Sequence, residues 1–223
     1  MRHHEVSLLE PLFKQIKDRF QLGPALHLTY IENLVGICET GGIRARNQLA
    51  AVNYQSLANE DVQTARAIIK VPFTNRSLHD YAPLYFGFKT PMVAWNQTRN
   101  EQMIFLRFSL DILSQGGVVI SDGNARSSAT RFFSFTNMDD LAQLDASAIN
   151  TVKYARDPEL KRRKQAEILV PDFLAISECI DIIVFSMTSA ATVLATLGRF
   201  GIKKAVRVNP GLYFGTANPR SDF

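Results

Sequence analysis

The stretch Leu160–Leu174, LKRRKQAEILVPDFL, carries four consecutive cations, then one acid, Glu167, and then an apolar run. The apolar run indicates a strand that is buried. A buried carboxylate without a partner is energetically expensive, so Glu167 must contact solvent, a cation or a ligand. From the residues alone, two interpretations stay open. Either Glu167 forms an ion pair with Lys164 or Arg163 at the strand end, or it holds a single charge in a pocket.

The length of 223 residues predicts one domain, or one domain with an appended subdomain, and the 15 phenylalanines are enough for a sizeable core. Cys38 and Cys179 lie far apart, which indicates neither a zinc site nor a disulfide framework. No apolar run approaches the ~20 residues that cross a bilayer, and the charged first residues are untypical of a signal peptide. We therefore expect a reduced, cytoplasmic protein without a membrane partner.

The net charge of +4 is unevenly distributed, with basic residues gathered at Lys161–Lys164 and at Arg199–Arg207. Basic clusters favour an anionic partner, and nucleic acid is the first candidate. The alternative is that each cluster is simply a solvated face of the protein.

The spacing of apolar and turn residues predicts short helices and short strands in irregular order. We expect helices at 8–20, 32–40 (stopped by Gly41 and Gly42), 124–133 and 139–155, a loop with a helix over 53–69, and a new element opening at Pro91. We expect strands at 25–31, 80–88, 102–110, 117–123, 166–174 and 205–214. This irregular mixture indicates an α+β fold and not a repeating βαβ sheet.

Two pairs of side chains in these elements suit the binding of a ligand. His27 lies near the end of the first predicted strand, where a ring nitrogen can meet a ligand hydroxyl, and Thr29 can do the same more weakly. Tyr81 and Tyr85 supply flat rings in the next, aromatic strand. Ordinary packing in the core is the alternative for all four residues.

Asn124 opens the helix predicted at 124–133. The free amide groups at a helix start suit a capping side chain, or a phosphate held with the help of Arg126. Capping is the simpler of the two interpretations.

Four segments occur together in a characteristic order, and they run from Leu26 to Phe173: LHLTYIENL, DYAPLYFGFKTPM, SDGNARSSATRFF and DPELKRRKQAEILVPDF. In these segments the chain resembles the DarT family of DNA ADP-ribosyltransferase toxins, within the ADP-ribosyltransferase superfamily. The resemblance implies an ADP-ribosyltransferase-like α+β fold, with central mixed or antiparallel sheets flanked by short helices. It also implies a single domain over residues 1–223, in which 1–24 form an N-terminal helical extension.

The resemblance implies a reaction as well as a fold. NAD would be the co-substrate, no metal would be needed, and ADP-ribose would pass to a nucleobase in single-stranded DNA, because a base paired in a duplex cannot be attacked at its pairing edge. Thymine-modifying relatives often carry a histidine where this chain has Asn124, which favours guanine over thymine as the target. Such a toxin would need an antitoxin, and a glycohydrolase (a macrodomain or similar) is the expected partner.

Roles for single residues follow from the same resemblance. Glu167 would be the catalytic acid, with Gln165 on the same face of an extended chain, and Arg66 would assist catalysis, surface solvation being its alternative. His79 is expected to be structural. The residues implied to bind NAD are His27, Thr29, Asn33, Tyr81 and Tyr85. The residues implied to contact DNA are Lys161, Arg162, Arg163, Lys164, Asn124 and Arg126.

Two other functions compete with this interpretation. A metal-dependent nuclease would use Asp122, Glu167 and a nearby lysine around a divalent ion, although the carboxylates lack a recognisable ligand spacing. A non-catalytic nucleic-acid-binding module would keep the fold and lose the chemistry. Removal of metal separates the nuclease from a transferase, and NAD-dependent mass added to an oligonucleotide separates the transferase from a binding module.

Overall fold

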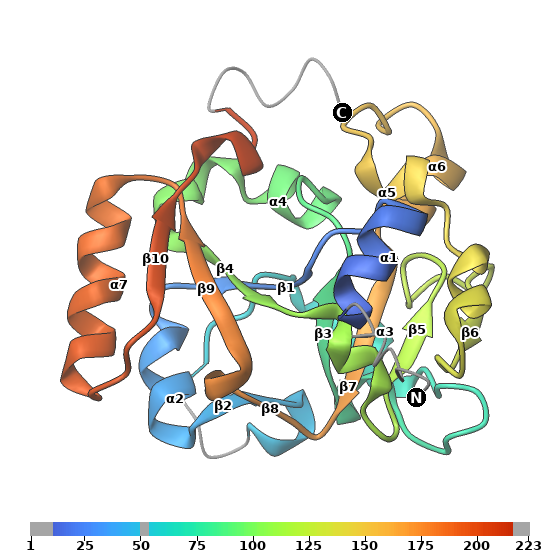
Figure 1. Cartoon of the computed structure of the whole chain (residues 1–223), viewed down its shortest axis with the longest axis horizontal. Helices are drawn as coiled ribbons and strands as arrows, with labels where there is room; N and C mark the ends of the chain where they lie inside the picture. The colour runs from blue at the N-terminus through green and yellow to red at the C-terminus, as the bar shows by residue number, and fades with distance from the viewer. Residues whose placement is uncertain (1–10, 50–53, 216–223) are drawn as a thin grey trace, which may run out of the picture.

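The computed structural model describes residues 11–49 and 54–215, and it contains a large sheet, a small sheet and short helices (Figure 1). The strands are β1 (Ala25–Tyr30), β2 (Gly42–Arg44), β3 (Tyr81–Tyr85), β4 (Met103–Phe108), β5 (Val119–Ser121), β6 (Phe132–Phe133), β7 (Glu167–Pro171), β8 (Phe173–Ala175), β9 (Cys179–Val184) and β10 (Ala205–Val208). The helices are α1 (Leu12–Phe20), α2 (Asn33–Thr40), α3 (Glu60–Ile68), α4 (Pro91–Trp95), α5 (Ala146–Asn150), α6 (Pro158–Arg163) and α7 (Met187–Arg199). Short 3-10 helices lie at Arg46–Gln48, Leu78–Asp80, Gln97–Gln102, Leu110–Ser114, Met138–Gln143, Ile176–Glu178 and Pro210–Leu212.

The large sheet has the strand order β10-β9-β4-β1-β3-β7-β5-β6, and β2 pairs with β8 in the small sheet. β10 runs parallel to β9, and the other neighbouring strands run antiparallel. β1 pairs with β4 along its whole length, whereas the register of β1 with β3 is the pair Leu26–Tyr85. The large sheet therefore consists of two halves, β10-β9-β4-β1 and β3-β7-β5-β6, which are joined through this one residue pair. Figure 1 shows α2 and α7 beside the half that contains β4, β9 and β10.

The core occupies both faces of the large sheet, as the alternation along β4 shows. Ile104 and Leu106 face one apolar cluster, which also contains Val193 of α7, while Met103 and Phe105 face a second cluster. Successive side chains of a strand point to opposite faces, so a strand covered on both sides is apolar throughout. This explains why β4 is apolar from Met103 to Leu106 and lacks the alternation of a half-exposed strand. The large, mostly antiparallel sheet with short helices confirms the α+β prediction.

The helix predicted at 124–133 is wrong. Residues 122–131 form a loop, which we call the 122–131 loop, and β6 follows it. The side chain of Asn124 accepts a hydrogen bond from the amide of Arg126 (3.0 Å), and Asp122 accepts one from the amide of Arg131 (2.9 Å). Such short side chains offer the backbone amides an alternative to the helical hydrogen bond.

Three other predicted elements differ at their ends or are divided. The helix predicted at 139–155 is divided into a 3-10 helix and α5, because Asp145 caps α5 by accepting the amide of Ala148 (2.8 Å). The strand predicted at 166–174 is divided into β7 and β8 by Asp172, which has a φ of 60°. The strand predicted at 205–214 ends at Val208, ahead of a 3-10 helix.

The N-terminal extension stays a prediction. Residues 8–10 of the predicted helix 8–20 lie outside the described part of the chain, and the described helix α1 buries Ile16 completely in the core. In residues 11–49 and 54–215, no helix has the length and apolar character needed to span a membrane.

Candidate functional site

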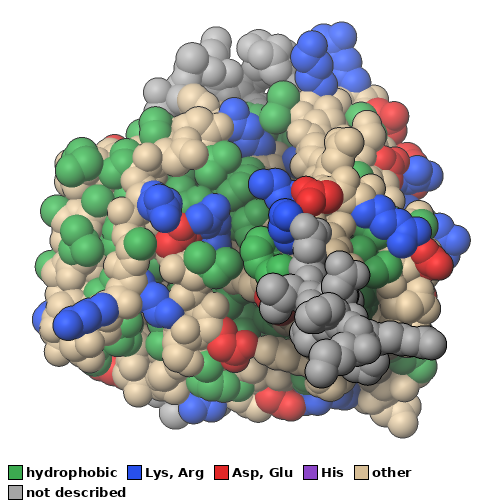
Figure 2. All heavy atoms as spheres, in the orientation of Figure 1, with side chains coloured by type: hydrophobic (Ala, Val, Ile, Leu, Met, Phe, Trp, Pro, Cys, Tyr) green, Lys and Arg blue, Asp and Glu red, His purple; other side chains and the backbone are tan. Residues whose placement is uncertain are grey.

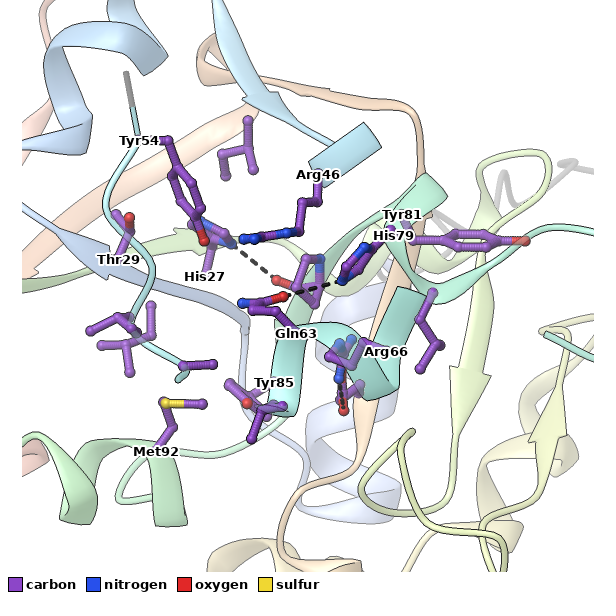
Figure 3. A pocket seen from close by; sticks show the side chains of 18 of the residues that line it. His27, Thr29, Arg46, Tyr54, Gln63, Arg66, His79, Tyr81, Tyr85 and Met92 are labelled. Atoms are coloured by element: carbon purple, nitrogen blue, oxygen red, sulfur yellow. Dashed lines mark hydrogen bonds and ion pairs between the residues drawn. The ribbon is translucent and has the colours of Figure 1, made fainter. Parts of the chain in front are cut away.

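A cavity of about 450 Å³ lies where the two halves of the large sheet meet (Figure 3). Its lining comes from elements far apart in the sequence, namely β1, α2, α3, β3, α4, the 122–131 loop, α6 and the start of β7. The volume is within the range of about 300–1,000 Å³ that is usual for small-molecule sites.

Glu167 is the first residue of β7 and lies on the cavity wall, opposite Tyr85 of β3 and Ser121 of β5. It is 2% exposed. Its carboxylate accepts two hydrogen bonds from Arg66, from Nη1 at 3.1 Å and from Nη2 at 2.9 Å, and a third from the amide of Ala125 at 3.0 Å. The backbone amide of Glu167 donates to Ser121 Oγ (3.1 Å). The position of this acid is therefore fixed from three sides.

The partner of Glu167 answers the question left open by the sequence. An ion pair with Lys164 or Arg163 is wrong, because Arg163 binds Glu159 instead and Lys164 is buried elsewhere. The acid lies in a pocket, as the second interpretation has it, and its cation is Arg66, which neither interpretation named.

Arg66 lies in the last turn of α3 and reaches into the cavity, where its side chain is 13% exposed. Surface solvation is therefore wrong for Arg66. Burial alone lowers the pKa of this guanidinium, but the charge and hydrogen bonds of Glu167 raise it, and the net pKa lies above its ordinary value. The guanidinium consequently stays charged, and its bidentate contact holds both oxygens of the Glu167 carboxylate in fixed directions.

Tyr85 is paired with Glu167 in the β3–β7 ladder and with Leu26 of β1, so it sits at the joint between the two halves. Burial, with the charge of Glu167 adding to it, raises the pKa of its phenol. Its hydroxyl is protonated near neutral pH and can donate to a ligand. Tyr81 has a different setting: it is buried, the guanidinium of Arg76 lies 5.4 Å from its ring centre, and Figure 3 shows the ring pointing away from Tyr85.

His27 faces the same cavity from β1. Its Nδ1 lies 3.0 Å from the carbonyl oxygen of Pro83, and because a carbonyl can only accept, Nδ1 carries the proton. Burial lowers the pKa of this imidazole, with the Pro83 hydrogen bond opposing the shift. The neutral ring therefore keeps Nε2 as an acceptor, which suits a hydroxyl such as that of a ribose.

Thr29 and Asn33 line the cavity but serve mainly the chain around it. Asn33 donates from Nδ2 to Thr29 Oγ1 (2.9 Å) and to the carbonyl of Gln55 (2.8 Å), and it accepts from the amide of Gln55 (2.8 Å). This two-way bond anchors the segment that carries Tyr54, whose ring lies 5.8 Å from the guanidinium of Arg46. Thr29 and Asn33 therefore support the cavity wall.

Sequence reasoning missed Arg46 and Tyr54, both of which line the cavity. Tyr54 is a lone aromatic in a polar stretch, ahead of an Asn59 that caps α3 by accepting the amide of Val62 (3.0 Å), and this pattern was the available signal. Nothing near Arg46 in the sequence marked it.

His79 is 8% exposed and joins a chain of hydrogen bonds at the cavity wall. Its Nε2 lies 3.2 Å from Gln63 Oε1, and Gln63 donates onward to Ser56 Oγ (2.8 Å). Burial lowers the pKa of His79, and the nearby charges of Arg46 and Arg66 lower it further. These contacts tie α3, which carries Arg66, to the wall beside β3.

The 122–131 loop supplies the amide of Ala125 that binds Glu167. Asp122 accepts from Arg162 Nη1 (2.7 Å) and from the amide of Arg131 (2.9 Å), which closes the loop on α6. Gly123 packs so closely that a Cβ there would lie 2.9 Å from the carbonyl oxygen of Arg162. The glycine is required by this approach, and the loop in turn sets the position of Glu167 through the amide of Ala125.

Asn124 and Gln165 meet at the mouth of the cavity, where Asn124 Nδ2 donates to Gln165 Oε1 (3.3 Å). Gln165 also donates to the carbonyl of Lys161 (2.9 Å). The predicted extended chain at Gln165 is wrong, since it lies in the turn between α6 and β7.

The cations of Lys161–Lys164 do not form one basic face. Arg162 is bound by Asp122 and Glu159, and Arg163 is bound by Glu159 and Asp145. Lys164 is 2% exposed and donates to the carbonyl of Ile149; burial, and then the charge of Lys89, lowers its pKa to about 8. The predicted contact of Lys164 with DNA is therefore wrong, because its side chain is packed in the interior.

Two cations remain at the cavity mouth, Lys161 of α6 and Arg126 of the 122–131 loop. Both are exposed, and within the described chain neither side chain has an ion pair. They are the groups best placed to meet an anion that approaches the cavity.

The carboxylates that a nuclease would need for a metal ion form ion pairs with arginines instead. Asp122 is held by Arg162 and Arg131, and Glu167 by Arg66. Over residues 11–49 and 54–215, no group of three or more His, Cys, Asp or Glu side chains has an arrangement that could hold a metal ion.

Known proteins resemble this chain in sequence and in fold. Residues 26–214 match the model of the family described as "ssDNA thymidine ADP-ribosyltransferase, DarT". A DNA ADP-ribosyl transferase of Thermus sp. (strain 2.9) is 33% identical over 195 residues, covering 83% of this chain and 92% of the relative.

Solved structures of the Thermus protein have similar folds. Thermus sp. 2.9 DarT in complex with ADP-ribosylated ssDNA superposes with a TM-score of 0.79 and 31% identity, over 86% of this chain and 96% of that one. The same DarT in complex with NAD+ gives a TM-score of 0.74 and 30% identity, over 86% and 97% of the two chains. A DNA ADP-ribosyl transferase–DNA ADP-ribosyl glycohydrolase fusion protein of Thermosipho africanus is 24% identical over 160 residues, 70% of this chain and 39% of the fusion protein.

Proposed function

Because the chain belongs to the DarT family of single-stranded-DNA ADP-ribosyltransferases, we propose that it transfers ADP-ribose from NAD to a nucleobase of single-stranded DNA. One observation carries the proposal. Glu167, His27 and Tyr85 face one cavity from three different strands, and the acid is held by Arg66 and by a backbone amide. This is an anion in a fixed position beside an acceptor and a donor of hydrogen bonds.

The lining of the cavity fits a dinucleotide. His27 Nε2 is an acceptor for a ribose hydroxyl, the Tyr85 hydroxyl is a donor, and Arg46 and Arg66 are cations suited to phosphate or to the acid beside it. Relatives with known structures have been solved with NAD+ bound. NAD as a substrate supplies an ADP-ribosyl group, and positive charge develops on its ribose as the bond to nicotinamide breaks.

Glu167 performs the central electrostatic step. A carboxylate that faces developing positive charge binds the transition state more tightly than the ground state. Arg66 acts through Glu167, because its two hydrogen bonds fix the direction of both oxygens in advance. Overall, a base N–H bond is replaced by a bond to the ribose carbon, and nicotinamide and one proton are released.

Single-stranded DNA is the acceptor that the cavity mouth favours. A base must leave a duplex before its edge can enter a pocket, and a single strand requires no such step. Lys161 and Arg126 are exposed on the mouth, where they can bind backbone phosphates. Arg162, Arg163 and Lys164 are left with structural roles by their contacts.

The proposal also concerns which base of the DNA receives ADP-ribose. The sequence favours guanine through Asn124, whereas the family description names thymidine. The oxygen of the Asn124 side chain accepts from the amide of Arg126 and its nitrogen donates to Gln165, which fixes the orientation of this side chain at the cavity mouth. We keep guanine and thymine as the two candidates that the experiment compares.

The biological role follows from the same family. We propose that the chain is the toxin of a toxin–antitoxin pair and that a DNA ADP-ribosyl glycohydrolase neutralises it. The Thermosipho relative, in which both activities are named for one fused chain, supports this partner.

The decisive experiment is mass analysis of short oligonucleotides incubated with the protein and NAD. Each oligonucleotide contains one thymine or one guanine in an otherwise constant strand, and Glu167→Ala is the inactive control. The expected result is the addition of one ADP-ribosyl group to one of the two, unaffected by a chelator. Strand cleavage abolished by the chelator would identify a nuclease, and binding without any added mass would identify a non-catalytic module.

A further inference from the structure

The chain has one tryptophan, Trp95, and it lies on the surface. Trp95 is the last residue of α4, it is 77% exposed, and it lines the mouth of the cavity. Tryptophan is highly buried on average, and an indole ring beside a binding cavity offers a flat apolar face to a ligand. The position of Trp95 at the cavity, and not its exposure alone, marks it as a contact.

The backbone that carries Trp95 is firmly held, so the exposure is not that of a loose end. Val93 of the same helix is completely buried. The next residue, Asn96, donates to the carbonyl of Met92 (2.9 Å) and accepts from the hydroxyl of Tyr30 (3.0 Å). The helix is thus fixed on both sides of Trp95, and the ring is displayed to solvent by a rigid element.

Trp95 and the free cations lie on parts of the rim contributed by different elements. α4 follows β3, which ends in Tyr85, and Figure 3 shows Met92 of α4 on the Tyr85 side of the cavity. Arg126 and Lys161 come from the 122–131 loop and α6, the elements packed around Glu167. A strand of DNA that places one base at Glu167 can therefore meet cations on one part of the rim and an aromatic ring on another.

We propose that Trp95 is a stacking subsite for a nucleobase of the DNA strand that neighbours the modified base. The inference rests on the proposed function and adds a contact to it. Every base has a flat face, so stacking on an exposed indole secures a single strand without selecting its sequence. The subsite would hold the strand while the target base occupies the pocket.

We favour a base of the DNA strand over the adenine of NAD as the group that stacks on Trp95. The groups suited to NAD, His27, Tyr85 and Arg66, line the interior of the cavity, where side chains are mostly covered. Trp95 is open to solvent at the cavity mouth, where a ligand that continues beyond the cavity can cover its exposed ring. A polynucleotide continues in this way.

Fluorescence tests the contact directly, because all tryptophan emission comes from Trp95. The full chain is titrated with a single-stranded oligonucleotide and, separately, with NAD. The expected result is a saturable change of emission with the oligonucleotide and none with NAD. An equal change with NAD, or no change with the oligonucleotide, overturns the proposal.

Kinetics of two variants provide the second test. Stacking of one base is worth about 1–3 kcal/mol, so Trp95→Ala is expected to raise the KM for a long oligonucleotide about tenfold, with the KM for NAD and kcat within about twofold of the parent. Trp95→Phe keeps a ring and is expected to stay within about threefold. With an oligonucleotide reduced to the target nucleotide, Trp95→Ala and the parent are expected to be equal.

Phe73→Ala is the matched control, because Phe73 is an exposed aromatic (66%) that does not line the cavity. It is expected to leave the KM for the oligonucleotide unchanged. A Trp95→Ala variant that matches the parent on the long oligonucleotide overturns the subsite. Since the fluorescence titration with the oligonucleotide contains no NAD, it decides the subsite even if the parent transfers nothing, and the failures of the two proposals are thereby distinguished.

Discussion

Replacement of Glu167 by glutamine removes one charge and almost no volume, so its effect on stability measures the buried ion pair. In the parent, Glu167 and Arg66 have side chains that are 3% and 13% exposed, and two hydrogen bonds of 3.1 and 2.9 Å join them. In Glu167→Gln the guanidinium keeps its position and loses its counter-charge. The amide of Ala125 keeps an acceptor, because the glutamine oxygen can replace the carboxylate oxygen.

Removal of one partner from a buried ion pair costs about 3–5 kcal/mol, because the remaining charge is left uncompensated. The residual exposure of Arg66 reduces this penalty, so we expect the free energy of unfolding to fall by about 3 kcal/mol. For a chain of this size, 1 kcal/mol corresponds to about 2–4 °C, which predicts a Tm lower by about 6–12 °C. The transfer of ADP-ribose is expected to be lost as well.

Urea denaturation of four proteins tests this reasoning: the parent, Glu167→Gln, Arg66→Met and the double variant. Because the double variant has no unpaired charge, the coupling energy between the two positions is expected to be about 2 kcal/mol or more. Asp139→Asn is the control, since Asp139 pairs with Arg19 at 2.6 Å but the two side chains are 79% and 55% exposed. An exposed pair of this kind contributes less than about 1 kcal/mol.

A coupling energy as small as that of the exposed pair would refute the reasoning. It would mean that Arg66 and Glu167 do not share a desolvated contact, and that the acid is held by the 122–131 loop alone.

Three further predictions concern the cavity mouth, the loop and pH. Lys161→Ala is expected to weaken DNA binding and to reduce the slope of its salt dependence by about 1, whereas Lys164→Met should leave both unchanged; equal effects in filter binding would contradict the burial of Lys164. Gly123→Ala places a methyl group 2.9 Å from a backbone oxygen of α6, so kcat should fall at least tenfold, while Gly116→Ala, with open space around it, should retain the parent kcat. The pKa of His27 is lowered below its ordinary value of 6.5, so the unfolded state binds protons more readily, and stability should fall as the pH drops below about 6.5. His27→Gln should reduce the slope of that part of the curve of unfolding free energy against pH, while His79, whose pKa is also lowered, supplies the remainder; an unchanged slope would show that His27 does not titrate in this range.

Much of the fold and part of the site could be predicted from the sequence. The apolar alternation and the turn residues located β1, β3, β4, β5 and β7, and helix signals located α2 at its glycine stop. The helix predicted at 124–133 failed because Asp122 and Asn124 bind backbone amides of the loop, a competition between neighbours that composition does not reveal. Glu167 and His27 were predicted to share a site from the resemblance, and the structure brings them to one cavity.

The partners of these residues could not be predicted, because they come from distant parts of the chain. Arg66 lies 101 positions from Glu167, and the amide of Ala125 lies 42 positions away. In the basic stretch, Lys161 and Lys164 are alike in sequence, yet one is exposed at the cavity mouth and the other is buried against Ile149. Which of two lysines meets solvent depends on which elements pack against the turn between α6 and β7.

The sequence by itself determined several strands of the large sheet, the end of α2 and the place of one acid at the head of a buried strand, because backbone preferences and apolar spacing act over a few neighbouring residues. Only the tertiary structure decided which cation neutralises that acid, which lysine remains free and where the tryptophan ring is displayed. These outcomes depend on burial and on contacts between remote segments, and the energy of a charge or a ring is set by those surroundings and not by its neighbours in the chain.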